Sequence, residues 1–126
     1  MVKKFLIFLY IFIISINTGF CSNYLDCNSA IDAGQPFILY IHANYCNACR
    51  AFSPIFESVV QNMSYNIVDI NFSYPQTKNI CTTAESRTIP AVYIVNPNTR
   101  TRSKIKSDTY FNPILLKKAI YELINQ

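Results

Sequence analysis

Residues 42–54 read HANYCNACRAFSP, and this stretch determines how the rest of the chain is interpreted. Cys46 and Cys49 are separated by two residues, and His42 lies just upstream of them. A Cys-x-x-Cys pair occurs in redox proteins, in metal sites and as a structural disulfide. Haem attachment is excluded, because Arg50 and not a histidine follows the second cysteine.

The N-terminus of the 126-residue chain has the pattern of a signal peptide. A short basic start precedes FLIFLYIFIISI at residues 5–16, a run of about 12 residues, which is shorter than the roughly 20 that a membrane-spanning helix needs. We therefore expect a signal peptide at residues 1–21 and one exported domain, periplasmic or secreted, at residues 22–126. The alternatives are an uncleaved N-terminal segment that acts as a membrane anchor, and a lipid anchor on Cys21.

Export changes the interpretation of the cysteines, because disulfides form and persist outside the cytosol. The mature chain keeps Cys27, Cys46, Cys49 and Cys81. Cys27 and Cys81 form either a structural disulfide or two separately used thiols. The sequence does not decide between these, since it does not show whether their Cα atoms come within the roughly 7 Å that a disulfide requires.

The charge of the chain points away from nucleic acid. The net charge of +4 falls to about +2 when the signal peptide is removed, too low to suggest a nucleic-acid partner. Basic residues alternate with uncharged ones at Arg100, Arg102, Lys104 and Lys106. This alternation is typical of the solvated face of an edge strand.

Hydrophobic periodicity predicts the elements around the cysteines. FILYIHA, residues 37–43, is short and apolar and is expected to be a strand buried on both faces. Apolar residues then recur at helical spacing from Phe52 to Met63, so Cys46 and Cys49 begin an amphipathic helix. The remaining predicted elements are a helix at 28–33, strands at 65–72, 91–95 and 102–106, a short helix that starts near Ile80, and a final helix capped by Asn112 with Pro113 in its first turn.

The order of these elements predicts an α/β fold with a central mixed four-stranded sheet flanked by helices. Alternation of strand and helix in the first half implies a parallel pair of strands. The turn at residues 96–98 joins the last two strands as an antiparallel hairpin.

This arrangement resembles the thioredoxin superfamily over about residues 28–125. The apolar strand runs into an aromatic residue followed by Cys46-Asn47-Ala48-Cys49, as in the family. Pro54 lies where the family has a proline inside its helix, and RTIPAVYIV at 87–95 is similar to the segment that contains the family's cis-proline. The resemblance implies that Pro90 is cis and leaves a backbone edge free beside Cys46 for a substrate chain.

Thiol chemistry fits the cysteines in this position. A helix N-terminus stabilises a thiolate, because its free amides and its dipole favour negative charge. Cys46 is therefore expected to attack a substrate disulfide as the nucleophile, and Cys49 to resolve the mixed disulfide. No bound cofactor or metal is expected.

Two positions before the cysteines, Tyr40 and His42, differ from the family pattern, and two further residues, Tyr45 and Asp69, have roles that the sequence leaves open. Thioredoxins that act as reductants carry a buried acid six positions before the first cysteine, where this chain has Tyr40. His42 replaces a common tryptophan and either moves a proton or stabilises the thiolate, or is simply a polar residue at a strand end. Tyr45 either contacts substrate or packs, and Asp69 either approaches the dithiol as a proton relay or is solvated.

The function expected from these residues is that of an exported thiol-disulfide oxidoreductase. It would act on protein thiols or disulfides and be recycled by an upstream redox partner. Two alternatives are a non-catalytic thioredoxin-like module that binds a partner, and a copper-binding module that uses Cys46, Cys49 and His42.

Overall fold

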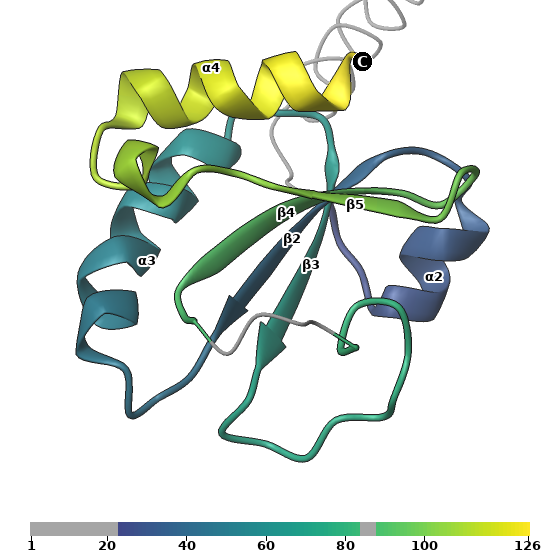
Figure 1. The fold of residues 1–126 in the computed structure, drawn as a ribbon, viewed down its shortest axis with the longest axis horizontal. Coiled ribbons are helices and arrows are strands. Elements are labelled where there is room, and N and C mark those ends of the chain that lie inside the picture. The colour runs from purple at the N-terminus through teal and green to yellow at the C-terminus, as the bar shows by residue number, and fades with distance from the viewer. Residues whose placement is uncertain (1–22, 84–87) are drawn as a thin grey trace, which may run out of the picture.

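The computed structural model describes residues 23–83 and 88–126, so the predicted signal peptide at 1–21 lies outside the described residues. A five-stranded sheet in the order β1-β3-β2-β4-β5 is covered by helices on both faces (Figure 1). The elements in chain order are β1 (Asn23–Tyr24), α2 (Cys27–Asp32), β2 (Phe37–His42), α3 (Asn47–Val60), β3 (Asn66–Asn71), β4 (Ala91–Asn96), β5 (Thr101–Lys104), the short 3₁₀ helix η1 (Ser107–Thr109) and α4 (Pro113–Ile124).

The mixed sheet confirms the predicted strand directions. The central strand β2 runs parallel to β3 and antiparallel to β4, and β4 and β5 form the predicted antiparallel hairpin. The predicted number of strands was wrong, because β1 adds a fifth strand parallel to β3. With two residues, β1 is too short to show any alternation of apolar and polar side chains.

Alternate side chains of β2 point to two separate cores, because successive residues of a strand face opposite sides of a sheet. Ile38 and Tyr40 pack against apolar residues of α3 and α4. Phe37, Leu39 and Ile41 pack against α2 and the segment after β3. The strand is therefore buried on both faces, as its apolar sequence predicts.

The ends of α4 and α3 are formed by the predicted residues. Asn112 caps α4 by accepting the N–H groups of Ile114 and Leu115 at 3.1 and 3.2 Å, and Pro113 occupies its first turn. Pro54 lies inside α3, which continues on both sides of it. Since α3 begins immediately after Cys46, its N-terminus lies at the Cys-x-x-Cys turn.

The short helix expected near Ile80 is absent from residues 72–83, and residues 84–87 are not described. Asn79 forms a turn there instead, with its side-chain oxygen accepting the N–H groups of Cys81 and Thr82 at 2.9 and 3.2 Å. Side chains of this type compete with helical hydrogen bonds by binding nearby backbone groups. The prediction was wrong because this local competition favours the turn.

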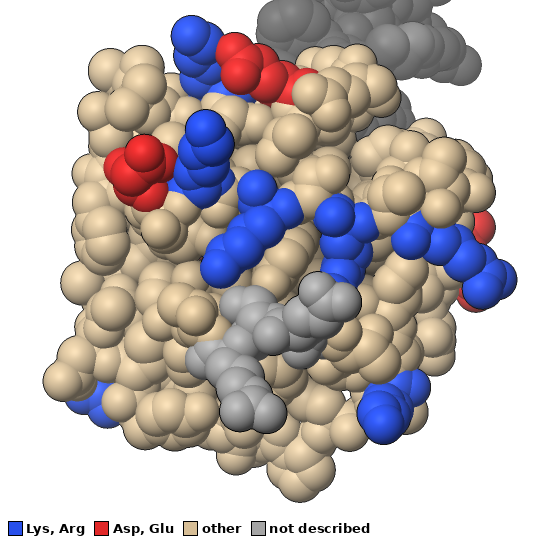
Figure 2. Space-filling view, in the orientation of Figure 1, with Lys and Arg blue, Asp and Glu red and all other residues tan. Residues whose placement is uncertain are grey.

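The basic residues near the C-terminus lie on an edge strand, as predicted, since β5 is the outer strand at one side of the sheet. Figure 2 shows basic side chains in a band across the face on which β5 and α4 lie. Arg102 differs from the prediction that these basic side chains are simply solvated. Its guanidinium lies 5.1 Å from the centre of the Tyr93 ring and donates to the carbonyl oxygens of Ile80 and Thr83. In residues 23–83 and 88–126, no helix combines the length and apolar character needed to cross a membrane.

Candidate active site

The two cysteines of the Cys-x-x-Cys turn lie at the N-terminus of α3. Cys46 is the N-cap residue, and its sulfur accepts the backbone N–H of Cys49 at 3.1 Å. The two side chains are joined as a disulfide, with Cα atoms 5.2 Å apart. Cys46 is partly exposed whereas Cys49 is 1% exposed. This geometry makes Cys46 the accessible sulfur and gives it the stabilising environment of a helix N-terminus.

A backbone segment passes beside Cys46. The Ile89–Pro90 peptide bond is cis, as the resemblance implied, and the carbonyl oxygen of Ile89 lies 3.8 Å from the Cys46 sulfur. The strand β4 begins directly after Pro90. The segment before β4 is therefore in contact with the more exposed cysteine.

Hydrogen bonds to Asn44 fix the loop between β2 and Cys46. The Asn44 carbonyl accepts from Nε and Nη2 of Arg50, and its N–H donates to the hydroxyl of Ser73 at 2.7 Å. Its side-chain oxygen accepts from Nδ2 of Asn71 at 2.8 Å. The Cys-x-x-Cys turn is thus tied both to its own helix and to the segment after β3.

Two tyrosines are exposed on the two connected loops. Tyr45, next to Cys46, is 72% exposed, and Tyr74, next to Ser73, is 61% exposed. Each ring leaves a large apolar area in contact with water, and this area is free to pack against another molecule. The structure excludes the packing alternative for Tyr45.

His42 and Asp69 form a pair across the parallel strands β2 and β3. The atoms His42 Nε2 and Asp69 Oδ1 are 2.6 Å apart. The imidazole also stacks on the ring of Tyr40, with ring centres 4.7 Å apart and planes 18° apart. Because a carboxylate only accepts hydrogen bonds, Nε2 carries a proton, and in the neutral imidazole Nδ1 is the nitrogen left to accept one.

Tyr40, which stands where the family has a buried acid, does not supply a charge. Its hydroxyl shares a 2.7 Å hydrogen bond with Ser53, and its side chain is 1% exposed. Burial raises the pKa of Tyr40, and the hydrogen bond shared with Ser53 only partly opposes this. The phenol is therefore neutral at physiological pH.

A surface recess of about 620 Å³ lies beside the buried cysteine. We call it the active-site recess. Residues of α3 at four-residue intervals form one wall, because such residues share a helix face. The polar and sulfur-bearing residues that line it are His42, Asn44, Cys49, Arg50, Ser53 and Glu57.

Glu57, at the far end of this wall, is hydrogen-bonded to a residue of the sheet. It accepts a 3.0 Å hydrogen bond from the hydroxyl of Tyr24. Burial, followed by this hydrogen bond, raises the pKa of Tyr24, so the phenol remains a donor to Glu57. The spacing of Cys49, Ser53 and Glu57 was visible in the sequence, although neither Ser53 nor Glu57 was predicted to be part of the site.

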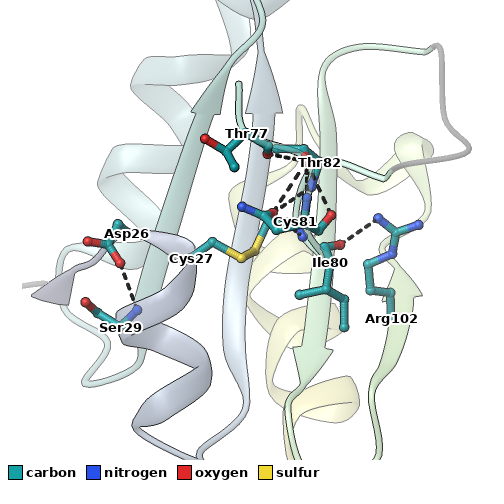
Figure 3. The surroundings of a disulfide bond; sticks show 9 residues. Asp26, Cys27, Ser29, Thr77, Ile80, Cys81, Thr82 and Arg102 are labelled. Atoms are coloured by element: carbon teal, nitrogen blue, oxygen red, sulfur yellow. Dashed lines mark hydrogen bonds between the residues drawn. A yellow bond between two sulfur atoms is a disulfide. The ribbon is translucent and has the colours of Figure 1, made fainter. Parts of the chain in front are cut away.

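The other two cysteines form a second disulfide away from the α3 N-terminus. Cys27, the first residue of α2, is bonded to Cys81, with Cα atoms 6.2 Å apart and both side chains buried (Figure 3). Asp26 caps α2 by accepting the N–H of Ser29 at 2.8 Å. On the other side of the loop, Arg102 binds the carbonyl of Ile80. The disulfide alternative for Cys27 and Cys81 is therefore the correct one.

The predicted site residues lie on three structural segments, of which β3 is connected to the dithiol region through the contact of Asp69 with His42. His42 and Tyr45 flank the end of β2, Asp69 approaches from β3, and the segment before β4 supplies Pro90. In the part of the chain that the structure describes, no three Cys, His, Asp or Glu side chains are grouped as metal ligands. Cys46 and Cys49, two of the three copper ligands considered from the sequence, are here bonded to each other as a disulfide.

Comparison with known proteins agrees with this geometry. The model of the family described as Thioredoxin matches residues 23–114, and the chain belongs to the thioredoxin family. None of the curated protein sequences matches the chain.

Several solved structures have the same fold. The J-Trx1 fragment of ERdj5 has a TM-score of 0.65 at 13% identity, over 82% of this chain and 52% of the fragment, so the chain spans about half of that fragment. Thioredoxin O2 from Arabidopsis thaliana, in its oxidized state, has a TM-score of 0.60 at 17% identity, over 82% of this chain and 95% of its own. Spinach chloroplast thioredoxin f has a TM-score of 0.58 at 16% identity, over 82% of this chain and 95% of its own.

At these identities the solved structures establish the fold alone. The chemistry depends on the residues of this chain, and the decisive feature is a cysteine pair joined at the start of a helix. Family membership together with this pair supports a general thiol-disulfide oxidoreductase role for the protein.

Proposed function

We propose that the protein is an exported thiol-disulfide oxidoreductase that exchanges disulfides with protein substrates through Cys46 and Cys49. The observation that carries this proposal is the arrangement at the α3 N-terminus. Cys46 is partly exposed and accepts the Cys49 N–H at 3.1 Å, while Cys49 is buried one turn further on. Cys46 can thus reach a substrate, and Cys49 can then attack Cys46 to re-form the intramolecular disulfide.

The reaction proceeds through two displacements. The Cys46 thiolate attacks one sulfur of a substrate disulfide, and the other substrate sulfur leaves as a thiolate. Cys49 then attacks the Cys46 sulfur, which breaks the mixed disulfide and releases the second substrate thiol. The substrate is reduced, and the two cysteines are oxidised to the disulfide seen in the structure. The reverse sequence donates the disulfide to a substrate dithiol.

Substrate binding is assigned to the surface around Cys46. The Ile89–Pro90 segment presents backbone beside the sulfur, and the exposed rings of Tyr45 and Tyr74 extend the contact surface. An extended polypeptide that carries an accessible cysteine fits this combination of a backbone edge and aromatic rings. No bound cofactor takes part, and an upstream redox partner resets the cysteines after each cycle.

Export is part of the proposal. Two observations support it: the signal-peptide pattern at residues 1–21, and a buried disulfide between Cys27 and Cys81, a type of bond that persists in oxidising compartments. Periplasmic and secreted destinations are both consistent with these observations.

The test is the reduction potential of the Cys46–Cys49 pair in residues 22–126. The protein is equilibrated with dithiol and glutathione buffers, and free thiols are trapped and counted by mass. A reduction potential of about −270 mV indicates a reductant, and one of about −120 mV indicates a disulfide donor. Cys46→Ser is the control, since it removes the titrating pair. A pair that never equilibrates contradicts the proposal and leaves a non-catalytic binding module as the function.

A further inference from the structure

Cys49 needs a proton acceptor before it can act. The thiolate, and not the thiol, is the attacking species in disulfide exchange. Cys49 is 1% exposed, and burial disfavours a charged sulfur. Bulk water is therefore a poor acceptor for its proton, and a group that lines the same recess must take it.

The active-site recess brings one suitable base to Cys49. His42 lines the recess together with Cys49, and its side chain is 18% exposed, so water in the recess can reach the imidazole. The hydrogen bond to Asp69 occupies Nε2 and leaves Nδ1 as the accepting nitrogen. Histidine is also the side chain whose charge ordinarily changes near neutral pH.

The other groups around His42 are less suited to this role. From β2, Tyr40 is neutral and bonded to Ser53. From α3, Glu57 accepts the hydroxyl of Tyr24, which comes from β1, and the Arg50 guanidinium is a cation that donates to a backbone carbonyl. None of these combines a free accepting atom with a charge that changes near neutral pH.

We propose that His42 accepts the proton of Cys49 through water in the active-site recess, and that Asp69 is the positioning residue that holds the imidazole. This inference rests on the proposed oxidoreductase function and concerns only its second displacement. The Cys49 S–H bond breaks and the proton passes to Nδ1 of His42. The Cys49 electron pair then forms the bond to Cys46, and the bond between Cys46 and the substrate breaks. The departing substrate thiolate takes up a proton from the imidazolium or from solvent.

A disulfide reagent that releases a coloured nitrobenzoate thiolate separates the two displacements. The Cys46–Cys49 pair of residues 22–126 is first reduced, with Cys27–Cys81 intact. The first released thiolate then reports attack by Cys46, and the second reports attack by Cys49. Cys49→Ser gives the first phase only and so assigns the second. If even the unmodified protein shows no second phase, the proposed function fails, which is a different result from failure of the inference.

We expect His42→Phe, which keeps an aromatic ring over Tyr40, to slow the second phase about 100-fold at pH 7, the low end of what general-base catalysis supplies. The first phase changes by no more than about twofold, since the helix N-terminus, and not His42, favours the Cys46 thiolate. The loss shrinks as the pH rises, because hydroxide increasingly removes the Cys49 proton without help from the imidazole. A purely structural defect would persist at all pH values.

Two comparisons complete the test. His42 is the only histidine of the chain, so its NMR titration is unambiguous, and its midpoint must coincide with the pH midpoint of the second phase. Asp69→Asn, which keeps the imidazole but loses the carboxylate, gives an intermediate loss. Glu122→Gln, at an exposed carboxylate of α4 outside the recess, is the control and leaves the second phase within about twofold, while Glu57→Gln tests the competing carboxylate inside the recess. A second phase that is unchanged in His42→Phe, or that is lost in Glu57→Gln instead, would overturn the proposal.

Discussion

On one face of the sheet lie α3 and α4, which contain 14 and 12 residues, whereas the helix on the other face, α2, contains 6. The first face is packed with aromatic and aliphatic side chains of both long helices. The second core combines residues of the short helix, of the odd positions of β2 and of the segment after β3. Each face also contains one of the two disulfides of the described residues.

The difference shows why the same bond has two roles in one molecule. The Cys27–Cys81 bond spans 54 residues and removes much conformational freedom from the unfolded chain, about 4 kcal/mol in the loop-entropy model. The Cys46–Cys49 bond spans 3 residues, for which the same model gives about 2 kcal/mol. The long bond therefore stabilises the thinly covered face, while the short bond can open and close at little cost to the fold.

The largest expected effect is on exchange activity and separates the two pairs. Cys46→Ser removes the attacking sulfur, so turnover of a protein disulfide should fall to the uncatalysed rate. Cys49→Ser should accumulate a mixed disulfide that gel electrophoresis without reductant detects. The double variant Cys27→Ala, Cys81→Ala is the control and should retain activity below its unfolding transition. Full activity in both active-site variants would rule out the assignment of the dithiol.

The second effect is on stability, to which we expect the Cys27–Cys81 pair to contribute more than the Cys46–Cys49 pair. Cys27→Ala with Cys81→Ala should lower the free energy of unfolding by about 2–4 kcal/mol, measured by denaturant titration of the otherwise oxidised protein. Reduction of Cys46–Cys49 alone should lower it by less. If the two pairs contribute equally, the contrast between a structural and a working disulfide is incorrect.

The helical face provides a third test at Tyr110, whose hydroxyl accepts the N–H of Val92 at 2.9 Å and donates to the carbonyl of Ile105. Tyr110→Phe leaves the buried N–H without its acceptor, so we expect a loss of about 1–3 kcal/mol at pH 7. Tyr121→Phe, at an exposed ring, is the control and should change the unfolding free energy by no more than about 0.5 kcal/mol.

The same residue makes a prediction about pH. Burial raises the pKa of Tyr110 from 10.0 to about 12, so the folded protein keeps this proton over a range in which the unfolded chain has lost it. The stabilisation is complete below pH about 10 and is lost as the pH rises through about 12. The advantage of the wild-type protein over Tyr110→Phe should therefore shrink across this range. If the difference in unfolding free energy between the two proteins stays constant over this range, ionisation of Tyr110 does not cause the loss of stability at high pH.

Local patterns made the helical face predictable from sequence. The apolar run at 37–43, the helical spacing after Cys46 and the capping pair Asn112-Pro113 each depend on neighbours in the chain, and each gave the correct element. The strand directions followed because the connections restrict the topology to a few alternatives.

The second face could not be predicted in the same way, because its contacts join distant positions. The Cys27–Cys81 pairing depends on a turn set by the side chain of Asn79, and the predicted short helix at that place was wrong. The pairing of His42 with Asp69 required the register of β2 against β3, in which Tyr40 lies opposite Asp69 and His42 opposite Asn71. A sequence pattern indicates neighbouring parallel strands but does not supply that register.

The smallest expected effect tests whether α4 depends on its cap. Asn112→Ala removes the oxygen that accepts the N–H groups of Ile114 and Leu115, and such changes cost about 1 kcal/mol. Asn112→Asp keeps an acceptor and should retain nearly all of the stability, since negative charge is favourable at a helix N-terminus. Because α4 packs on the same core as α3 but does not line the active-site recess, exchange kinetics should be unchanged in both variants. A kinetic change without a stability change would mean that the coupling between α4 and the cysteine turn is stronger than their packing indicates.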